Sequence, residues 1–348
     1  MSLDGLAARS VAVIREHQAA SGAYLAAPFP AAYRNAWLRD GAFVADAMSR
    51  AGERASVEAF FSWCAVVVEG RAGRMAAREI LDGRFTVDGQ EVPGRWSSAQ
   101  LDGYGAWVWA LGGHVRRHGV AFAPAPWLSA VRTSLRYAAD CWQTPCFDWW
   151  EERRGVHVAT LAALYGGLTS GLVEEDWATG AAESIFSAVR RDGVVKGRLA
   201  ARLGEGGLDA SLIAVATPFG LLGHDDPLME ATVRTVESEL MVGRGVHRHP
   251  RDEFYGGGLW VVLAGLLGWH YARMRRVEEA RAELDWSAAA ASADGELPEQ
   301  VEERLLHPRK RAEWVDRWGP PARPLLWSHA LFLTLALELG TLSLENAA

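Results

Sequence analysis

The stretch "CFDWWEERRG" (146–155) lies between two segments with helical periodicity, residues 126–142 and 156–171. It belongs to a set of long loops, rich in aromatic and charged residues, that precede every second predicted helix. The others are "AAYRNAWLRD" (31–40), "GRWSSAQLDGYG" (94–105), "GVHRHPRDEFYGGG" (245–258) and "ELPEQ" (296–300) with the residues up to 324. In an array of antiparallel helix pairs, alternate junctions lie at the same end. These loops are therefore expected to gather at one end of a helical scaffold, where functional sites are commonly built.

Apolar spacing and breaker residues predict about twelve helices, and no Gly-, Ser- or Pro-rich linker divides the chain, which favours one domain over residues 1–348. The expected fold class is all-α, an (α/α)6 barrel of helical hairpins. A helical-repeat solenoid is the alternative, but no solenoid-type sequence period is present. Besides the two segments above, the predicted helices are 3–18, 39–52, 56–70, 99–117, 174–203, 208–217, 226–242, 257–275, 276–292 and 324–341.

Strand signals are scarce. One segment, "RFTVDGQEV" (84–92), has a good signal, and its Asp88-Gly89 pair predicts the turn of a short β-hairpin within a loop. The stretch 307–324 is interpreted as a long polar loop that leads into the last helix.

The composition indicates a globular protein without affinity for nucleic acid or membranes. Of 348 residues, 49% are hydrophobic and 23% charged, the net charge is −7, and no run of Lys and Arg stands out. No apolar run reaches membrane-spanning length, and the first residues lack the basic start of a signal peptide. Three cysteines without a CxxC pair predict neither a disulfide framework nor a zinc site, so a reducing cytoplasm is the expected location.

The chain contains 16 tryptophans. Tryptophan combines a flat apolar face with one N–H donor, so such an excess suits either a bulky core or a cleft that stacks against sugar rings. Trp149 and Trp150 stand directly before Glu151 and Glu152. Adjacent glutamates at a helix start commonly only complement its dipole. Tryptophan walls, however, desolvate a carboxylic acid and raise its pKa, so one glutamate is expected to donate a proton while its neighbour remains an anion.

Other loops carry polar residues whose role stays open on local grounds. Arg39 and Asp40 place a fixed donor beside a fixed acceptor, which suits vicinal hydroxyls, although Asp40 also fits a simple helix cap. Trp96 and Asp102 offer a stacking face and a polar contact, with capping by Asp102 as the alternative. Two histidines flank Arg248, but a pair two residues apart without an acidic partner pattern does not predict a metal site.

Six motifs follow one another along roughly residues 33–330, nearly the whole chain. They are "YRNAWLRD", "WSSAQLDG", "FDWWEE", "RHPRDEFYGGGLW", "LPEQ" and "LLWSHA". In the same order they resemble the aromatic-W-x-R-D, W-x-x-x-Q-x-D-G, [YF]-D-x-W-E-E, R-x-P-x-D-x-[YF]-x-G-x-x-x-W, second catalytic and L-x-W-S-x-A blocks of glycoside hydrolase family 15. That family comprises glucoamylases, glucodextranases and bacterial trehalases. A single match would be weak, whereas six in register are specific.

The resemblance implies a role for each matching residue. Glu151 matches the family's general acid, Glu299 its general base and Glu152 a substrate-binding carboxylate. The other residues implied to bind the substrate are Tyr33, Trp37, Arg39, Asp40, Trp96, Asp102, Trp150, Arg248 and Trp327. No metal ion or organic cofactor is implied, and the partner expected is a small carbohydrate.

The resemblance also implies an inverting hydrolysis. Glu151 would protonate the glycosidic oxygen while Glu299 activates a water molecule on the opposite face of the sugar. A closed pocket would make the enzyme exo-acting, so that it releases one glucose from the non-reducing end.

Departures from the family pattern narrow the expected substrate. Residues 97–100 read Ser-Ser-Ala-Gln where fungal glucoamylases have G-R-P-Q, and neither a starch-binding module nor an N-terminal β-sandwich is expected. Compact members of this kind resemble the isomaltose-hydrolysing branch, so short α-glucosides, above all isomaltose, are the expected substrates. An α,α-trehalase and a non-catalytic sugar-binding protein are the alternatives. The sequence does not distinguish a monomer from a homo-oligomer.

Overall fold

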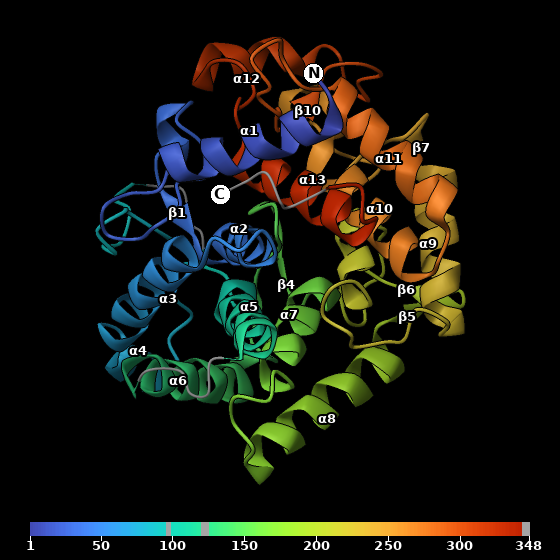
Figure 1. The fold of residues 1–348 in the computed structure, drawn as a ribbon. Helices are drawn as coiled ribbons and strands as arrows, with labels where there is room; N and C mark the ends of the chain where they lie inside the picture. The colour runs from blue at the N-terminus through green and yellow to red at the C-terminus, as the bar shows by residue number, and fades with distance from the viewer. Residues whose placement is uncertain (95–98, 120–124, 343–348) are drawn as a thin grey trace.

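The computed structural model describes residues 1–94, 99–119 and 125–342, and helices dominate it (Figure 1). No helix in these ranges is both long and apolar enough to cross a membrane. The α-helices are α1 (Leu3–Glu16), α2 (Leu38–Arg50), α3 (Arg54–Glu69), α4 (Ala72–Ala76), α5 (Asp102–His118), α6 (Ala125–Cys141), α7 (Val158–Leu168), α8 (Asp176–Asp192), α9 (Pro227–Glu239), α10 (Val261–Arg273), α11 (Val277–Ala289), α12 (Lys310–Trp318) and α13 (Leu326–Glu338).

The helices form two concentric layers. In the inner layer α2, α5, α7, the 3-10 helix η2 (Ala210–Val215), α10 and α13 pack in that order, and α13 packs against α2 to close the ring. In the outer layer α1, α3, α6, α8, α9 and α11 each cover one inner element, as Figure 1 shows. This arrangement confirms the predicted (α/α)6 barrel.

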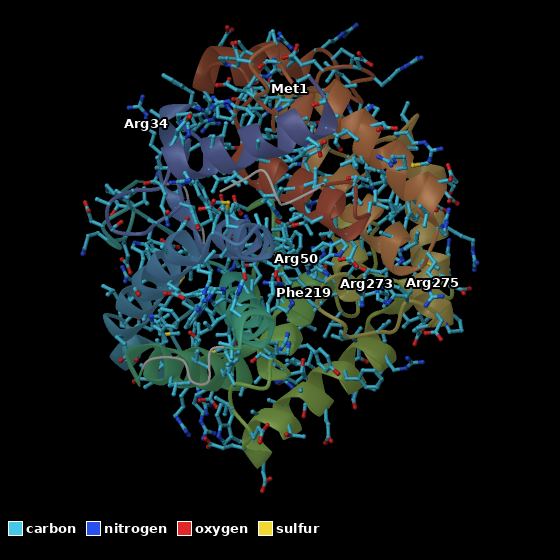
Figure 2. The ribbon with its side chains drawn as sticks, in the orientation of Figure 1. Met1, Arg34, Arg50, Phe219, Arg273 and Arg275 are labelled. Atoms are coloured by element: carbon cyan, nitrogen blue, oxygen red, sulfur yellow. The ribbon has the colours of Figure 1, made fainter. Side chains whose placement is uncertain are left out.

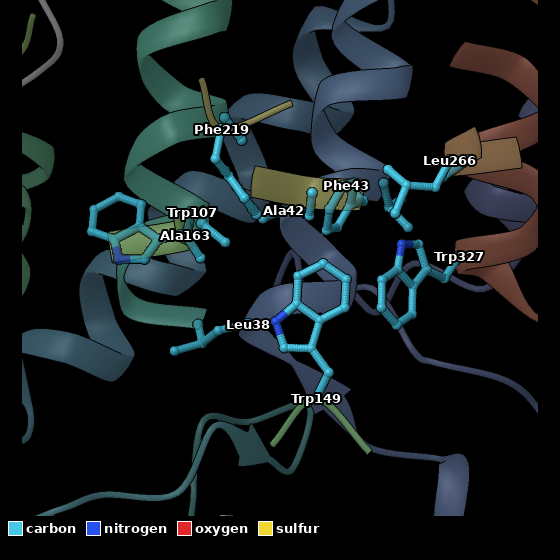
Figure 3. Close-up of a cluster of buried hydrophobic side chains, with 14 of the residues drawn as sticks. Leu38, Ala42, Phe43, Trp107, Trp149, Ala163, Phe219, Leu266 and Trp327 are labelled. Atoms are coloured by element: carbon cyan, nitrogen blue, oxygen red, sulfur yellow. The ribbon is translucent and has the colours of Figure 1, made fainter. Parts of the chain in front are cut away.

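The apolar content of each helix explains its layer. Every residue of α10 from Val261 to Tyr271 is buried, and α7 and α13 are almost as apolar. A helix that is hydrophobic all round has to be surrounded by protein, whereas the outer helices alternate apolar and charged faces. Figure 3 shows the resulting core around two tryptophans, Trp149 and Trp327. Phe219 lies close to them, as do Phe43, which belongs to α2, and Leu266, which belongs to α10.

Glycine allows α5 and α7 to approach closely. A Cβ atom at Gly105 would lie 2.4 Å from the carbonyl oxygen of Ala163, and one at Gly167 would lie 2.7 Å from the carbonyl oxygen of Gly105. Because real Cβ atoms do not tolerate such contacts, larger side chains at these two positions would push the inner helices apart.

The carboxyl ends of the inner helices are joined by ion pairs. Asp46 of α2 accepts hydrogen bonds from Arg50 and from Arg117 of α5, and Glu338 of α13 pairs with Arg50 and with Arg273 of α10. In Figure 2 Arg50 and Arg273 lie near the centre of the view beside Phe219, whereas Arg34 lies at its edge. Basic side chains at helix carboxyl ends also complement the helix dipole.

The amino ends of several inner helices are capped by carbonyl groups of loop residues, one of which, Arg248, lies in a long loop. Few of these helices have a side-chain cap, and their first N–H groups donate instead to loop carbonyls. The pairs are Leu38 N to Gly83 O at 3.0 Å, Val158 N to Ala201 O at 3.0 Å, Ala210 N to Arg248 O at 2.8 Å and Leu326 N to Ala26 O at 3.0 Å. Four of the long loops, 31–40, 146–155, 245–258 and 296–324, line one cavity at this end of the barrel, as predicted.

Three predicted elements were wrong in extent or type. The segment 174–203 is not one helix: α8 ends at Asp192, and the chain then forms a hairpin of β5 (Val194–Val195) and β6 (Arg198–Leu199). The segment 208–217 contains only the short 3-10 helix η2, and the supposed polar loop 307–324 contains the helix α12. The apolar or polar character of these three segments was predicted correctly. Their backbone conformation was not, because it depends on tertiary contacts.

The strands were underestimated because each is two residues long, too short for an alternating pattern to show. The turn at Gly89 forms, and Phe85 bridges Glu91 across it, but β2 (Arg84–Phe85) makes its ladder with β1 (Ala36–Trp37). Besides β1, β5 and β6, the strands that were not predicted are β3 (Cys146–Phe147) with β4 (Arg154–Gly155), and a sheet in the order β10 (Gln300–Val301), β9 (Leu259–Trp260), β8 (Gly245–Val246) and β7 (Met241–Val242).

Candidate active site

A cavity of about 550 Å³, counted with the solvent at its mouth, opens at the end of the barrel where the long loops gather. Its wall combines aromatic rings with two glutamates, two arginines and an aspartate. The lining residues are Ala26, Tyr33, Trp37, Arg39, Asp40, Trp149, Trp150, Glu151, Arg248, Phe254, Trp260, Glu299, Leu325 and Trp327. Most of the predicted site residues are thus brought together, although they come from loops far apart in the sequence.

Glu151 lies in the turn between β3 and β4, not at the start of a helix. Its φ angle is 60°, a left-handed conformation that residues other than glycine rarely adopt and that is enriched at functional sites. The carboxylate accepts a hydrogen bond of 2.9 Å from Trp37 Nε1. Burial raises the pKa of Glu151 to about 7, against the effects of Trp37 and of the nearby Arg39 charge.

Glu299 directly precedes β10 and is 2% exposed. Its Oε1 accepts a hydrogen bond of 2.7 Å from the Tyr33 hydroxyl, while Oε2 has no hydrogen-bond partner among the described residues. Burial raises the pKa of Glu299 to about 7, although Tyr33 and the Arg248 charge act in the opposite direction. The cavity therefore holds two carboxylic acids that change protonation near neutral pH.

One short segment supplies the donors to both acids. Tyr33 and Trp37 are four residues apart, and their ring centroids lie 5.8 Å apart with the rings nearly perpendicular. Tyr33 donates to Glu299 and Trp37 to Glu151, so this segment sets the relative position of the two carboxyl groups.

Arg39 and Asp40 lie on the cavity wall in the first turn of α2. The guanidinium of Arg39 lies 5.3 Å from the ring centroid of Trp327, and its Nε is 3.2 Å from Asp40 Oδ1. Arg39 Nη1 donates to Asp102 Oδ2 at 3.0 Å. Asp102 itself is 1% exposed and lies behind Arg39 rather than on the wall, so it anchors the arginine; direct contact of Asp102 with substrate stays a prediction. Burial raises the pKa of Asp40 to about 6 despite its pairing with Arg39.

Glu152 faces an ion-pair network instead of the cavity. Arg248 donates one hydrogen bond of 2.6 Å to Glu152 Oε1 and two, of 2.8 and 2.5 Å, to Asp252. On the other side, His249 Nε2 lies 3.0 Å from Glu152 Oε2. Burial alone would raise the pKa of Glu152, but Arg248 and His249 outweigh it and lower the pKa to about 2. The neighbours Glu151 and Glu152 therefore differ strongly in acidity. Glu152, His249 and Asp252 lie close enough together to suggest a metal site, but the Arg248 cation already pairs with both carboxylates.

Sequence reasoning missed several residues of the site. Asp209, at the start of η2, accepts hydrogen bonds of 3.1 and 2.9 Å from Trp150 Nε1 and one of 2.8 Å from Ser211 N. Phe254 and Trp260 complete the wall, and both fall within a motif that was quoted without being assigned roles. Nothing in the local sequence marks Asp209 as part of a site, because the contact with Trp150 joins two separate loops. The predicted residue Trp96 lies outside the residues that the structure describes.

A wider vestibule of about 2180 Å³ lies outside the cavity. It shares Tyr33, Trp150, Glu151 and Phe254 with the cavity, so the two spaces meet at Glu151. Its outer wall includes side chains of α12.

Comparison with known proteins identifies the family. The family model "Glycosyl hydrolases family 15" matches residues 1–312. The chain belongs to glycoside hydrolase family 15. Among family 15 relatives, the isomaltose glucohydrolase of Kribbella flavida is 44% identical, over 98% of this chain and 94% of its own length.

Solved structures agree with this family 15 assignment. A solved wild-type glycosidase is 42% identical with a TM-score of 0.93, and each chain is covered to 98%; a variant glycosidase with the same match was solved in complex with glucose. A bacterial glucoamylase complexed with acarbose shares the fold at a TM-score of 0.76 and 19% identity, over 97% of this chain and 56% of its own.

The raised pKa values predict a pH-dependent loss of stability. A carboxyl group with a pKa near 4.5 when unfolded and about 7 when folded holds its proton more tightly in the folded state. Stability is therefore lost as pH rises from about 4.5 to about 7, and the loss is complete above that range. Relative to wild type, Glu151→Gln and Glu299→Gln should each gain up to about 3 kcal/mol in unfolding free energy across this window.

The measurement is thermal or denaturant unfolding of wild type and variants from pH 4 to pH 8. Glu279→Gln is the matched control: Glu279 accepts a hydrogen bond from Arg276, which lowers its pKa, so Glu279 does not titrate in this range and the difference of this variant from wild type should stay constant between pH 5 and pH 7. A difference between wild type and Glu151→Gln that does not change with pH would show that Glu151 is not desolvated.

Proposed function

We propose that this family 15 enzyme is an inverting, exo-acting α-glucosidase that releases glucose from the non-reducing end of short α-glucosides, isomaltose foremost. The observation that carries the proposal is the pair of buried acids, Glu151 and Glu299, in the wall of one cavity, each with a pKa near 7. A protein that only binds sugars has no need to hold two desolvated carboxyl groups there, at a cost in stability.

The two acids divide the reaction between them. Glu151, protonated, donates its proton to the glycosidic oxygen as the bond to the leaving sugar breaks. Glu299, ionised, takes a proton from a water molecule that attacks the anomeric carbon from the opposite face, so α-linked glucose leaves as β-glucose. Tyr33 occupies Oε1 of Glu299, which leaves Oε2 to accept the proton of the water.

The part of the cavity that is lined by Arg39, Asp40 and the tryptophans suits a terminal glucose. Arg39 and Asp40 offer a fixed donor and acceptor for neighbouring hydroxyls, and Asp102 holds the arginine in place. Trp37, Trp149 and Trp327 supply apolar faces for the C–H surface of the ring.

A closed floor supports the exo mode of action. Trp149 and Trp327 pack against each other with centroids 5.7 Å apart, and Phe43 packs against both at 6.0 and 5.4 Å (Figure 3). Since the glucan chain cannot continue through this aromatic core, only a chain end can reach Glu151. The substrate class follows the relative of 44% identity, which is an isomaltose glucohydrolase.

A substrate panel tests the function. We expect hydrolysis of isomaltose to exceed that of maltose, nigerose, kojibiose and trehalose, and proton NMR of the earliest product to show β-glucose in excess of its equilibrium share. Cleavage of trehalose in preference to the others would identify the alternative, a trehalase. Excess α-glucose would exclude the inverting mechanism, and tight binding of isomaltose without glucose release would exclude catalysis.

Amide substitutions test the two catalytic roles. Glu151→Gln and Glu299→Gln remove the proton donor and the base while keeping size and shape, so each should lower kcat for isomaltose by at least about 10²-fold. Circular dichroism and thermal unfolding check that both variants fold. Near-wild-type turnover by either variant would refute the role of that residue.

Asp209 is expected to hold Trp150 in place beside Glu151. Asp209→Ala removes the acceptor for Trp150 Nε1 and should lower kcat/KM for isomaltose by about 10-fold, since the half-buried indole is no longer held beside Glu151. Asp209→Asn keeps one oxygen for Trp150 and Ser211 and should retain most of the activity. Equal losses in the two variants would show that the hydrogen bond to Trp150 is not what matters.

A further inference from the structure

The helix α12 (Lys310–Trp318) has an unusual surface. The structure describes all nine of its residues, and none is buried, although Trp314 and Trp318 stand one turn apart on it. Large aromatic side chains on a globular helix normally face the core. Here both face the vestibule, together with Arg317 between them. Both tryptophans are half-buried, and aromatic residues that stay partly open on one wall of a cleft indicate a binding surface.

The helix is attached to the rim of the catalytic cavity. It packs on the 3-10 helix η3 (Phe254–Gly256), where the ring centroid of Trp314 lies 4.9 Å from that of Phe254 in a near-perpendicular contact and 6.2 Å from that of Tyr255. Phe254 lines both the cavity and the vestibule. The aromatic surface of the cavity therefore continues through Phe254 onto α12.

The chemistry of this wall suits a sugar. The guanidinium of Arg317 lies 5.7 Å from the ring centroid of Trp314 and 5.2 Å from that of Trp318, which holds a planar cation beside two indole faces. Arg251 and Glu253 line the same vestibule. Apolar aromatic faces bind the C–H surface of a pyranose, while the charged groups at its edge bind hydroxyls.

The position of Glu151 decides which sugar reaches this wall. A general acid protonates the oxygen that joins the terminal glucose to the remainder of the substrate, and Glu151 lies where the cavity and the vestibule meet. The floor of the cavity is closed by Trp149 and Trp327, so the terminal glucose occupies the cavity. The sugar on the other side of the scissile bond must then lie in the vestibule.

We infer that α12 forms the binding site of the leaving sugar, with Trp314 and Trp318 as its stacking surface and Arg317 as its hydroxyl ligand. The inference rests on the proposed function and extends it to the part of the substrate that departs. The ligand class is a pyranose joined through an exocyclic or ring hydroxyl to the cleaved glucose, as in isomaltose.

The test compares two substrates that share the cleaved glucose and differ in the leaving group. In α-glucosyl fluoride the leaving group is a fluoride ion, which is too small to reach α12. Trp314→Ala, Trp318→Ala and Arg317→Ala are each assayed for kcat/KM on isomaltose and on α-glucosyl fluoride. Trp177→Ala, which removes a half-buried tryptophan of the outer helix α8, is the matched control.

We expect Trp318→Ala or Trp314→Ala to lower kcat/KM for isomaltose about 10-fold, mainly through KM, with less than a twofold change on α-glucosyl fluoride, as for loss of an aromatic stacking contact. Trp314 also supports Phe254, so Trp314→Ala can lower kcat/KM for both substrates. The inference still holds in that case if Trp318→Ala lowers kcat/KM for isomaltose alone. Equal changes on both substrates in all three variants, or no change in any, would overturn it. Failure of the wild type to cleave either substrate would instead refute the proposed function.

Discussion

The closure of the inner helical ring, where α13 packs against α2, is the constraint on which the active site depends. It joins the loop that ends at Asp40 to the loop that carries Glu299, although more than two-thirds of the chain separates them. Leu326 N donates to Ala26 O at 3.0 Å, and the Trp327 ring lies 5.3 Å from the Arg39 guanidinium. Only this junction places the Tyr33 hydroxyl 2.7 Å from Glu299. An open array of the same helix pairs would leave Glu299 without its donor.

The charged residues of the site have two kinds of surroundings. Arg39 and Arg248 are buried but paired with aspartates, and Glu152 is held ionised by Arg248. Glu151 and Glu299 instead accept a hydrogen bond from a neutral aromatic side chain, so burial dominates and their pKa values rise to about 7. The paired groups can hold a substrate without changing charge, whereas the two acids can exchange protons. The desolvation of these two acids and the left-handed backbone of Glu151 both cost free energy, which the packing of the barrel offsets.

The shape of the pocket complements this electrostatic division. The aromatic layer of Phe43, Trp149 and Trp327 belongs at once to the hydrophobic core and to the cavity floor, so the packing that stabilises the barrel also blocks the path of a glucan chain. The opposite side is open and bounded by α12, which is fastened to the rim through Phe254. The preference for one glycosidic linkage over another is decided in such a pocket at Glu151, where the cavity meets the vestibule.

Sequence alone determined the helical class, the gathering of long loops at one end and most of the polar and aromatic residues that line the cavity, because apolar periodicity and linear motifs are local properties of the chain. It located Glu151 and Glu299 but not the aromatic donors that each accepts from, and it placed Glu152 beside Glu151 without showing that Arg248, nearly a hundred residues away, keeps Glu152 ionised. Tertiary structure alone decided that residues 210–215 form a 3-10 helix, that α12 exists within a polar stretch, and that Asp209 holds Trp150. These features depend on contacts between segments distant in sequence, and no local pattern encodes such contacts.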